Sequence, residues 1–172
     1  MSDIASLYTD GGVVGRNPST IGGTWAWVQV ADDGLTRLRS YIGVVTPSDI
    51  GLPEVTNNLT EFLAALYGLE SMPRGWAGTV YTDSGVTKAR ITDGRKFNGI
   101  PDHFVSRLHA IRQQLGAYRV VLLGGHPTAL ELHRGFRRDG KPCSVHNVYC
   151  DQRCGEEAAR FRAKLQTKVG VV

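Results

Sequence analysis

The chain has 172 residues, of which 41% are hydrophobic and 21% charged, and its formal net charge is +4. This composition excludes a disordered chain, and no apolar run is long enough to cross a bilayer. The length suits one domain with one core, so we expect residues 1–172 to form a single domain. The start, MSDIASLYTD, lacks the basic-then-apolar order of a secretion signal, which predicts a cytoplasmic protein with no membrane partner.

Three strands and a helix are expected in the first half of the chain. Apolar runs at 4–9, 24–30 and 35–45 predict strands, and the turn Asp32-Asp33-Gly34 separates the second from the third. From 57 to 70 the apolar residues recur at helical spacing, which predicts a helix. The first three strands should therefore form an antiparallel meander.

The second half alternates strands with helices. The expected elements are a strand at 78–82, a short helix opening near Ser84, a loop at 93–101, a helix at 102–115, a strand at 118–123 and a final helix from about 152 to 168. The run at 118–123 gives the strongest signal of a buried strand. Because helices precede the fourth and fifth strands, each should lie parallel to a neighbour. We predict an α/β fold with a five-stranded mixed sheet and helices on both faces.

Four acidic residues occupy positions that suit a metal site. Asp10 is expected to end the first strand, Glu61 lies one turn into the long helix, Asp83 ends the fourth strand, and Asp151 opens the last helix. If the first and fourth strands are parallel neighbours, Asp10 and Asp83 emerge side by side. Adjacent carboxylates repel one another unless a hard cation such as Mg²⁺ or Mn²⁺ lies between them. Each aspartate alone could equally form a turn or cap a helix.

The contexts of these residues resemble type 1 ribonuclease H over nearly the whole chain. The segments that carry the resemblance are LYTDGG at 7–12, TNNLTE at 56–61, YTDS at 81–84, GGH at 124–126 and NVYCD at 147–151. Each motif is weak alone, but five in the same order are specific. The resemblance implies a ribonuclease H-like fold, with the fourth and fifth strands parallel to the first. It also implies an endonuclease that hydrolyses the RNA strand of RNA·DNA hybrids, and the small size with the complete motif set favours a monomer.

In that family, four carboxylates bind two Mg²⁺ ions together with the substrate, and Mn²⁺ can replace them. The resemblance assigns these roles to Asp10, Glu61, Asp83 and Asp151. Asp10 would bridge the ions, Asp151 would help to hold the ion that activates water, and Glu61 with Asp83 would hold the ion at the leaving 3′ oxygen. The products implied are a 5′-phosphate and a 3′-hydroxyl.

A second set of residues is expected to contact the hybrid: Gly11, Gly12, Thr56, Asn57, Asn58, Ser84 and Asn147. By resemblance, the amides of Asn57 and Asn58 read the minor groove, where a 2′-hydroxyl distinguishes RNA from DNA. The asparagines also suit a helix start, Ser84 suits a helix cap and the glycine pair suits a tight turn. Thr56 is a candidate contact to a phosphate of the DNA strand.

The family also uses a loop histidine for proton transfer or product release, and His126 matches it. Twenty residues separate His126 from Asn147, where shorter members have about half a dozen, so His146 is a rival. The long loop carries four basic residues, Arg134, Arg137, Arg138 and Lys141. They are either a solvated surface or phosphate contacts that replace a basic protrusion, for which 93–101 is too short. Three basic residues near that segment, Arg90, Arg95 and Lys96, would be only a remnant of it.

Three other interpretations stay open at this stage. Cys143, His146, Cys150 and Cys154 could hold zinc, although their spacing matches no standard finger. The chain could be another nuclease of the same fold class, such as a junction resolvase, or a non-catalytic nucleic-acid-binding module. The intact set of four carboxylates argues against the last of these.

Overall fold

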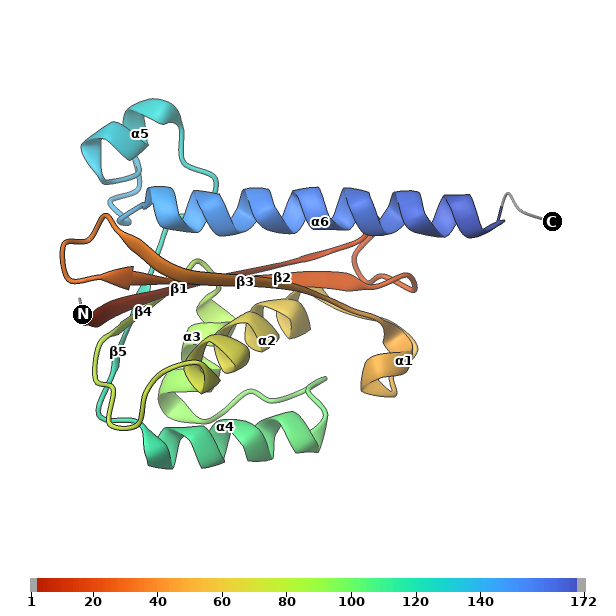
Figure 1. The fold of residues 1–172 in the computed structure, drawn as a ribbon, viewed down its shortest axis with the longest axis horizontal. Coiled ribbons are helices and arrows are strands. Elements are labelled where there is room, and N and C mark those ends of the chain that lie inside the picture. The colour runs from red at the N-terminus through yellow and green to blue at the C-terminus, as the bar shows by residue number, and fades with distance from the viewer. Residues whose placement is uncertain (1–2, 170–172) are drawn as a thin grey trace.

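The computed structural model describes residues 3–169, which form a five-stranded mixed sheet with helices on both faces (Figure 1). The strands are β1 (Ile4–Val13), β2 (Gly23–Ala31), β3 (Arg37–Val45), β4 (Thr79–Thr82) and β5 (Arg119–Leu122), in the order β3-β2-β1-β4-β5. The first three strands are antiparallel, β4 is parallel to β1, and β5 is parallel to β4. The predicted fold class and strand directions are confirmed.

Six helices surround the sheet in the described part of the chain. They are α1 (Pro47–Ile50), α2 (Asn57–Glu70), α3 (Gly85–Asp93), α4 (Asp102–Gln114), α5 (Ala129–Arg134) and α6 (Val145–Val169). Figure 1 shows α2, α3 and α4 below the sheet, α6 along its other face, and α5 beside the start of α6. No helix among the described residues is both long and apolar enough to cross a membrane.

The main core lies between the sheet and α2, whose bounds match the predicted range. Thr56 caps the helix by accepting a hydrogen bond from the Leu59 N–H at 3.2 Å. The side chains of Phe62, Leu63 and Leu66 are completely buried, and burial of each such side chain stabilises the fold by roughly 1.5–3 kcal/mol. This packing fixes α2 against β1.

Two strands differ from their predicted form. β1 continues past Asp10, because Gly11, Gly12 and Val13 remain paired with β2, so the Gly pair does not end the strand. Within the run at 118–123, β5 lies at the sheet edge, where no described strand pairs with its outer side; Arg119–Leu122 are half-buried or exposed, and only Leu123 is buried. The prediction of a buried strand there was wrong.

The last helix begins at Val145, seven residues before the predicted start. The Ser144 hydroxyl accepts the His146 N–H at 3.1 Å, and the Ser144 carbonyl accepts the Val148 N–H at 3.2 Å, which starts the helix at this point. Asp151 therefore lies in the second turn of α6 and does not open the helix. The helices α1 and α5 were not predicted, and both are short segments with a capping box at Thr46 and Thr128.

Candidate active site

Three carboxylates converge at the centre of the molecule. One oxygen from each of Asp10, Glu61 and Asp83 lies within 4.8 Å of the other two. The parallel pairing of Tyr8 with Tyr81 brings the residues two positions further along, Asp10 and Asp83, to the same height. β4 ends at Thr82 while β1 continues, so Asp83 leaves the sheet beside Asp10, and α2 supplies Glu61.

Gly11 permits this approach of β1 to α2. A Cβ at Gly11 would lie closer than 3.0 Å to backbone atoms of Thr60 and Glu61, whereas one at Gly12 would make ordinary contacts with the Thr24 side chain. Both glycines are strand residues, so their interpretation as a tight turn was wrong. The missing side chain at Gly11 is required for helix packing and also leaves bare backbone beside the carboxylates.

The three carboxyl groups are held in an environment that disfavours their charge. Burial, followed by repulsion from Asp83, raises the pKa of Asp10 from 3.8 to about 8. Burial and the neighbouring Asp10 raise the pKa of Glu61 well above its usual range, and burial raises that of Asp83. Glu61 Oε2 is buried without a hydrogen-bond partner. A hard divalent cation would satisfy these oxygens and replace the protons, so the donor set fits such an ion.

Asp151 lies at the rim of the same cleft. Its side chain is 50% exposed, and its Oδ2 is 3.7 Å from Nδ1 of His126. The cleft has a volume of about 480 Å³, and the four predicted carboxylates line it together with Gly11, Gly12, Asn57, Ser84, Gly125, His126 and Arg137. Asp151 does not belong to the buried trio, but it faces the same space.

Of the two candidate histidines, only His126 reaches the cleft. It follows β5, has a positive φ of 49°, and its side chain is 84% exposed. His146 is buried, and both of its ring nitrogens are occupied: Nδ1 accepts from Arg37 Nε at 3.2 Å, and Nε2 lies 3.0 Å from the Gly34 carbonyl, to which it donates. His146 thus ties α6 to the β2–β3 turn.

The predicted substrate residues fall into two groups. Asn57 and Ser84 line the cleft beside the glycines, and Ser84 also caps α3 by accepting from the Thr87 N–H at 3.1 Å. Thr56 and Asn58 are exposed at the start of α2, outside the cleft lining. Asn147 is buried and its Nδ2 lies 3.4 Å from Asp83 Oδ2, so it supports the carboxylate and does not face the open cleft.

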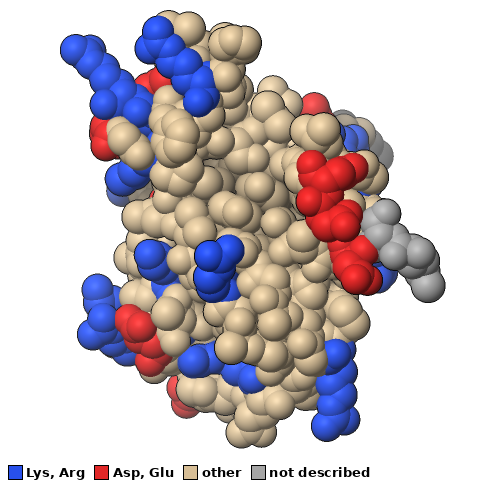
Figure 2. All heavy atoms as spheres, turned by 90° about the vertical axis from the view of Figure 1, so that its left-hand side faces the viewer, with Lys and Arg blue, Asp and Glu red and all other residues tan. Residues whose placement is uncertain are grey.

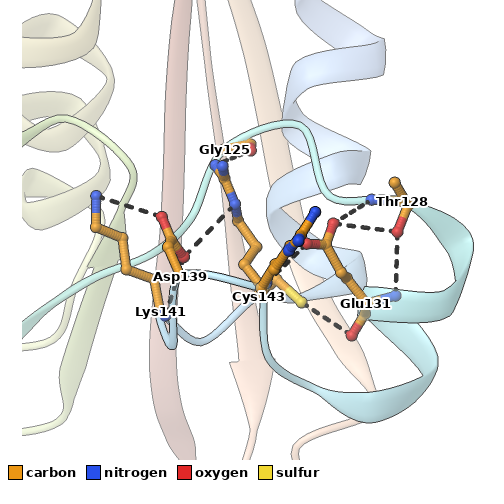
Figure 3. Close-up of polar contacts among 8 residues, drawn as sticks. Gly125, Thr128, Glu131, Asp139, Lys141 and Cys143 are labelled. Carbon is orange, nitrogen blue, oxygen red and sulfur yellow. Dashed lines mark hydrogen bonds and ion pairs between the residues drawn. The ribbon is translucent and has the colours of Figure 1, made fainter.

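The basic loop is an ordered structure, and its four cations point to different places. Arg137 enters the cleft, where its Nη1 donates to the Gly125 carbonyl at 2.6 Å. Figure 3 shows Gly125 together with the contact between Asp139 and Lys141. Arg134, Arg138 and Lys141 are exposed and do not line the cleft. No signal in the sequence distinguished Arg137 from its neighbours.

The interpretation of Arg90 as part of a basic remnant was wrong. Arg90 is buried, and its guanidinium donates to the carbonyls of Asn58 at 2.6 Å, Lys96 at 2.9 Å and Asn98 at 3.3 Å. It therefore holds the 96–98 segment against the first turn of α2. Arg95 pairs with Asp93 at the surface, at 2.8 Å.

The residues considered for zinc do not come together. Cys150 and Cys154 are buried under β1, where their thiols contact the carbonyls of Tyr8 and Asp10, while the Cys143 thiol contacts the Glu131 carbonyl. Within residues 3–169, no cluster of three metal-ligating side chains contains a cysteine or a histidine. The zinc interpretation has no structural support.

Comparisons with known proteins point to one family, although no protein-family model matches the chain. It is 39% identical over 97 residues to a ribonuclease H of Dinoroseobacter shibae, a match that covers 54% of this chain and 55% of that one. Ribonucleases H of Ruegeria sp. TM1040 and Lachnoclostridium phytofermentans are 41% identical over 97 residues and 35% identical over 80 residues, covering 54% and 46% of this chain and 55% and 46% of theirs. The chain thus spans about half the length of the curated relatives it matches.

Solved structures extend the likeness to nearly the whole chain. The N-terminal RNase H domain of a Mycobacterium tuberculosis protein superposes with a TM-score of 0.59 at 17% identity, covering 94% of this chain and 99% of that one. RNase H1 of Halobacterium salinarum gives 0.53 at 18% identity, covering 70% and 85%. An RNase H1 in complex with an RNA/DNA hybrid gives 0.52 at 19%, covering 68% and 84%. The chain therefore has the fold of the RNase H domains to which it was compared, and over about half its length its sequence is similar to that of ribonucleases H.

Proposed function

We propose that the chain is a divalent-metal-dependent endoribonuclease that hydrolyses the RNA strand of RNA·DNA hybrids. The observation that carries this proposal is the convergence of two buried carboxylates, Asp10 and Glu61, with the half-buried Asp83, and no ion pair to any of the three is formed within the described residues. Relatives named ribonuclease H, and a similar fold in an RNase H1 solved with an RNA/DNA hybrid, support the choice of substrate.

Asp10, Glu61 and Asp83 would hold the metal from the buried side of the cleft, and Asp151 would contribute from the rim. Two bound Mg²⁺ ions, or Mn²⁺ in their place, would supply a lowered water pKa and charge neutralisation at the leaving oxygen. In-line attack on the phosphorus would leave a 5′-phosphate and a 3′-hydroxyl. His126, which is exposed and 3.7 Å from Asp151, would carry a proton between the cleft and solvent.

Recognition of the RNA strand would come from the cleft wall beside Asp10. Asn57 and the bare backbone of Gly11 and Gly12 line this wall. Amide and backbone groups can donate to and accept from a 2′-hydroxyl, which DNA lacks. Thr56 and Asn58 lie just outside the cleft, where the neighbouring nucleotides would pass. Asn147 acts through Asp83 in this proposal.

The basic loop would add affinity without sequence preference. Arg137 faces the cleft, so it would contact a phosphate close to the cleaved bond. The exposed Arg134, Arg138 and Lys141 would meet phosphates of the nucleic acid where it leaves the cleft. Such contacts release counterions, so binding should weaken steeply as salt is raised.

We further propose that the chain acts as a monomer in the cytoplasm. All four predicted carboxylates line one cleft within this chain, so a second copy would not be needed to complete the site. Cys143, Cys150 and Cys154 are free thiols, which suits a reducing compartment.

A panel of end-labelled substrates tests the function. The protein is incubated in Mg²⁺ with an RNA·DNA hybrid, duplex RNA, duplex DNA and a four-way junction. Cleavage confined to the RNA strand of the hybrid, with 5′-phosphate ends and loss of cleavage on chelation, is the expected result. Junction cleavage would instead indicate a resolvase, and tight binding without cleavage would indicate a non-catalytic module.

A further inference from the structure

A second hollow lies next to the active-site cleft, on α5 and the loop that follows it. It has a volume of about 630 Å³ and is lined by Thr128, Leu130, Glu131, Arg134, Phe136, Arg137 and Arg138; we call it the α5 cup. Leu130 is 56% exposed and Phe136 is 59% exposed, and both are among the most exposed large apolar side chains of the described residues. Arg137 lines both the cup and the cleft, so the two hollows adjoin.

The charges that the cup presents outward are positive. The Glu131 carboxylate forms hydrogen bonds within the loop: it accepts from the backbone N–H groups of Thr128 and Arg138, each at 2.8 Å (Figure 3). Asp139 lies 3.7 Å from Arg137 and 3.9 Å from the Lys141 ammonium. Figure 2 shows Lys and Arg side chains gathered at the upper left, at the height of α5 in Figure 1, while the largest acidic group lies on the right.

The cup is built on a braced loop. Phe136 and Pro142 form a β-bridge, the Gly124 N–H donates to the Pro142 carbonyl at 2.8 Å, and the Cys143 thiol contacts the Glu131 carbonyl at 3.2 Å. These contacts connect the cup to the turn that carries His126. An exposed ring on a fixed backbone loses little conformational freedom when it binds a flat partner.

We propose that the α5 cup binds an unpaired nucleotide of a single strand that continues from the hybrid held in the cleft. In a duplex the faces of the bases are covered by their neighbours, so only an unpaired base can stack on Phe136 and contact Leu130. Arg134 and Arg138 would hold the flanking phosphates. This inference rests on the proposed function for the placement of the hybrid. It predicts tighter binding of hybrids that end in a single-stranded extension.

The test measures binding by fluorescence anisotropy with the Asp10→Asn protein, so that no substrate is cleaved. The probes are a blunt hybrid, the same hybrid with a six-nucleotide extension on either strand at either end, and the same extensions built from abasic residues. We expect one extended hybrid to bind about tenfold more tightly than the blunt one, and the abasic version to lose most of that gain. Equal binding of the natural and abasic extensions would overturn the proposal.

Variants separate the cup from the rest of the surface. In the same background, Phe136→Ala should remove the gain from the extension and leave blunt-hybrid binding unchanged, while Phe136→Tyr should keep it. Leu35→Ala, at a 77% exposed leucine in the β2–β3 turn, is the matched control and should change nothing. Base stacking in the cup would be refuted if Phe136→Ala kept the full gain in affinity from the extension. It would also be refuted if this variant lost affinity equally for blunt and extended hybrids. If the wild-type protein cuts no hybrid but extended hybrids still bind more tightly than blunt ones, the proposed activity is wrong and the proposed binding site in the cup is supported.

Discussion

Replacing Asp10 by asparagine should stabilise the metal-free protein at alkaline pH, although it removes a residue of the proposed active site. The pKa of Asp10 rises on folding from 3.8 to about 8, so the folded protein binds this proton more tightly than the unfolded chain does. Stability from this group is therefore fully present below about pH 4 and is lost as the pH rises through about 8. Asparagine carries no charge, so the variant escapes that loss.

The pKa rise sets the size of the effect. At about 1.4 kcal/mol for each tenfold change in proton affinity, the full rise corresponds to roughly 6 kcal/mol above pH 8. Glu61 and Asp83 share the repulsion, and the cleft is open to water, so we expect the free energy of unfolding of Asp10→Asn to exceed that of the wild type by roughly 1–3 kcal/mol. At pH 4, where Asp10 is protonated in the folded protein and about half protonated in the unfolded chain, the difference should be small.

Urea unfolding in chelator at pH 4 and pH 8.5 measures this difference. Asp32→Asn, at an exposed turn position, is the control and should show no pH-dependent gain. Addition of Mg²⁺ at pH 8.5 should stabilise the wild type more than Asp10→Asn, because the ion binds the folded carboxylates. A variant that is no more stable than the wild type at pH 8.5 would refute the reasoning that the buried cluster is strained by its own charge.

Three further changes test other parts of the structure. Gly11→Ala should lower the free energy of unfolding by roughly 2–4 kcal/mol, because the new methyl group meets the backbone of Thr60 and Glu61; urea unfolding measures it, and a change below 0.5 kcal/mol would contradict the close approach. Arg90→Met, which keeps the stem and removes the donors to three carbonyls, should cost roughly 2–4 kcal/mol in the same assay, and a neutral result would show that those carbonyls find other partners. Arg137→Ala should lower kcat on the hybrid by roughly tenfold, because the Gly125 carbonyl loses its hydrogen-bond donor, and it should flatten the salt dependence of KM. Steady-state kinetics at two salt concentrations measure both effects. Unchanged kcat and KM at both concentrations would show that Arg137 has no role in the reaction.

The features that could be predicted from the sequence depend on local patterns. α2 was predicted to the residue, because the apolar spacing of 57–70 is a pattern that acts within a few turns. The convergence of Asp10 with Asp83 followed from parallel neighbouring strands, and the structure has that pairing. The fold class and the acidic cluster could therefore be predicted from residue spacing and strand topology.

The features that could not be predicted depend on tertiary contacts. Arg90 was grouped with surface cations, and only the fold reveals three carbonyls around its guanidinium. The Gly11-Gly12 pair has the composition of a turn, but pairing with β2 keeps it in a strand. The sequence did not distinguish His126 from His146 as the loop histidine. In the structure, His146 is buried beside Arg37, and this contact rules it out. The α5 cup depends on a loop whose order comes from Glu131 and a β-bridge, which no periodicity signals.

The most direct test of the central claim is a cleavage assay on one RNA·DNA hybrid with a different label on each strand. With Mg²⁺ the wild-type protein should cut the RNA strand internally and leave the DNA strand whole, and Asp10→Asn or excess chelator should abolish cutting. Cutting of the DNA strand, or cutting of RNA that persists in Asp10→Asn or in chelator, would contradict the assignment of the buried carboxylate cluster as a metal-dependent ribonuclease H centre.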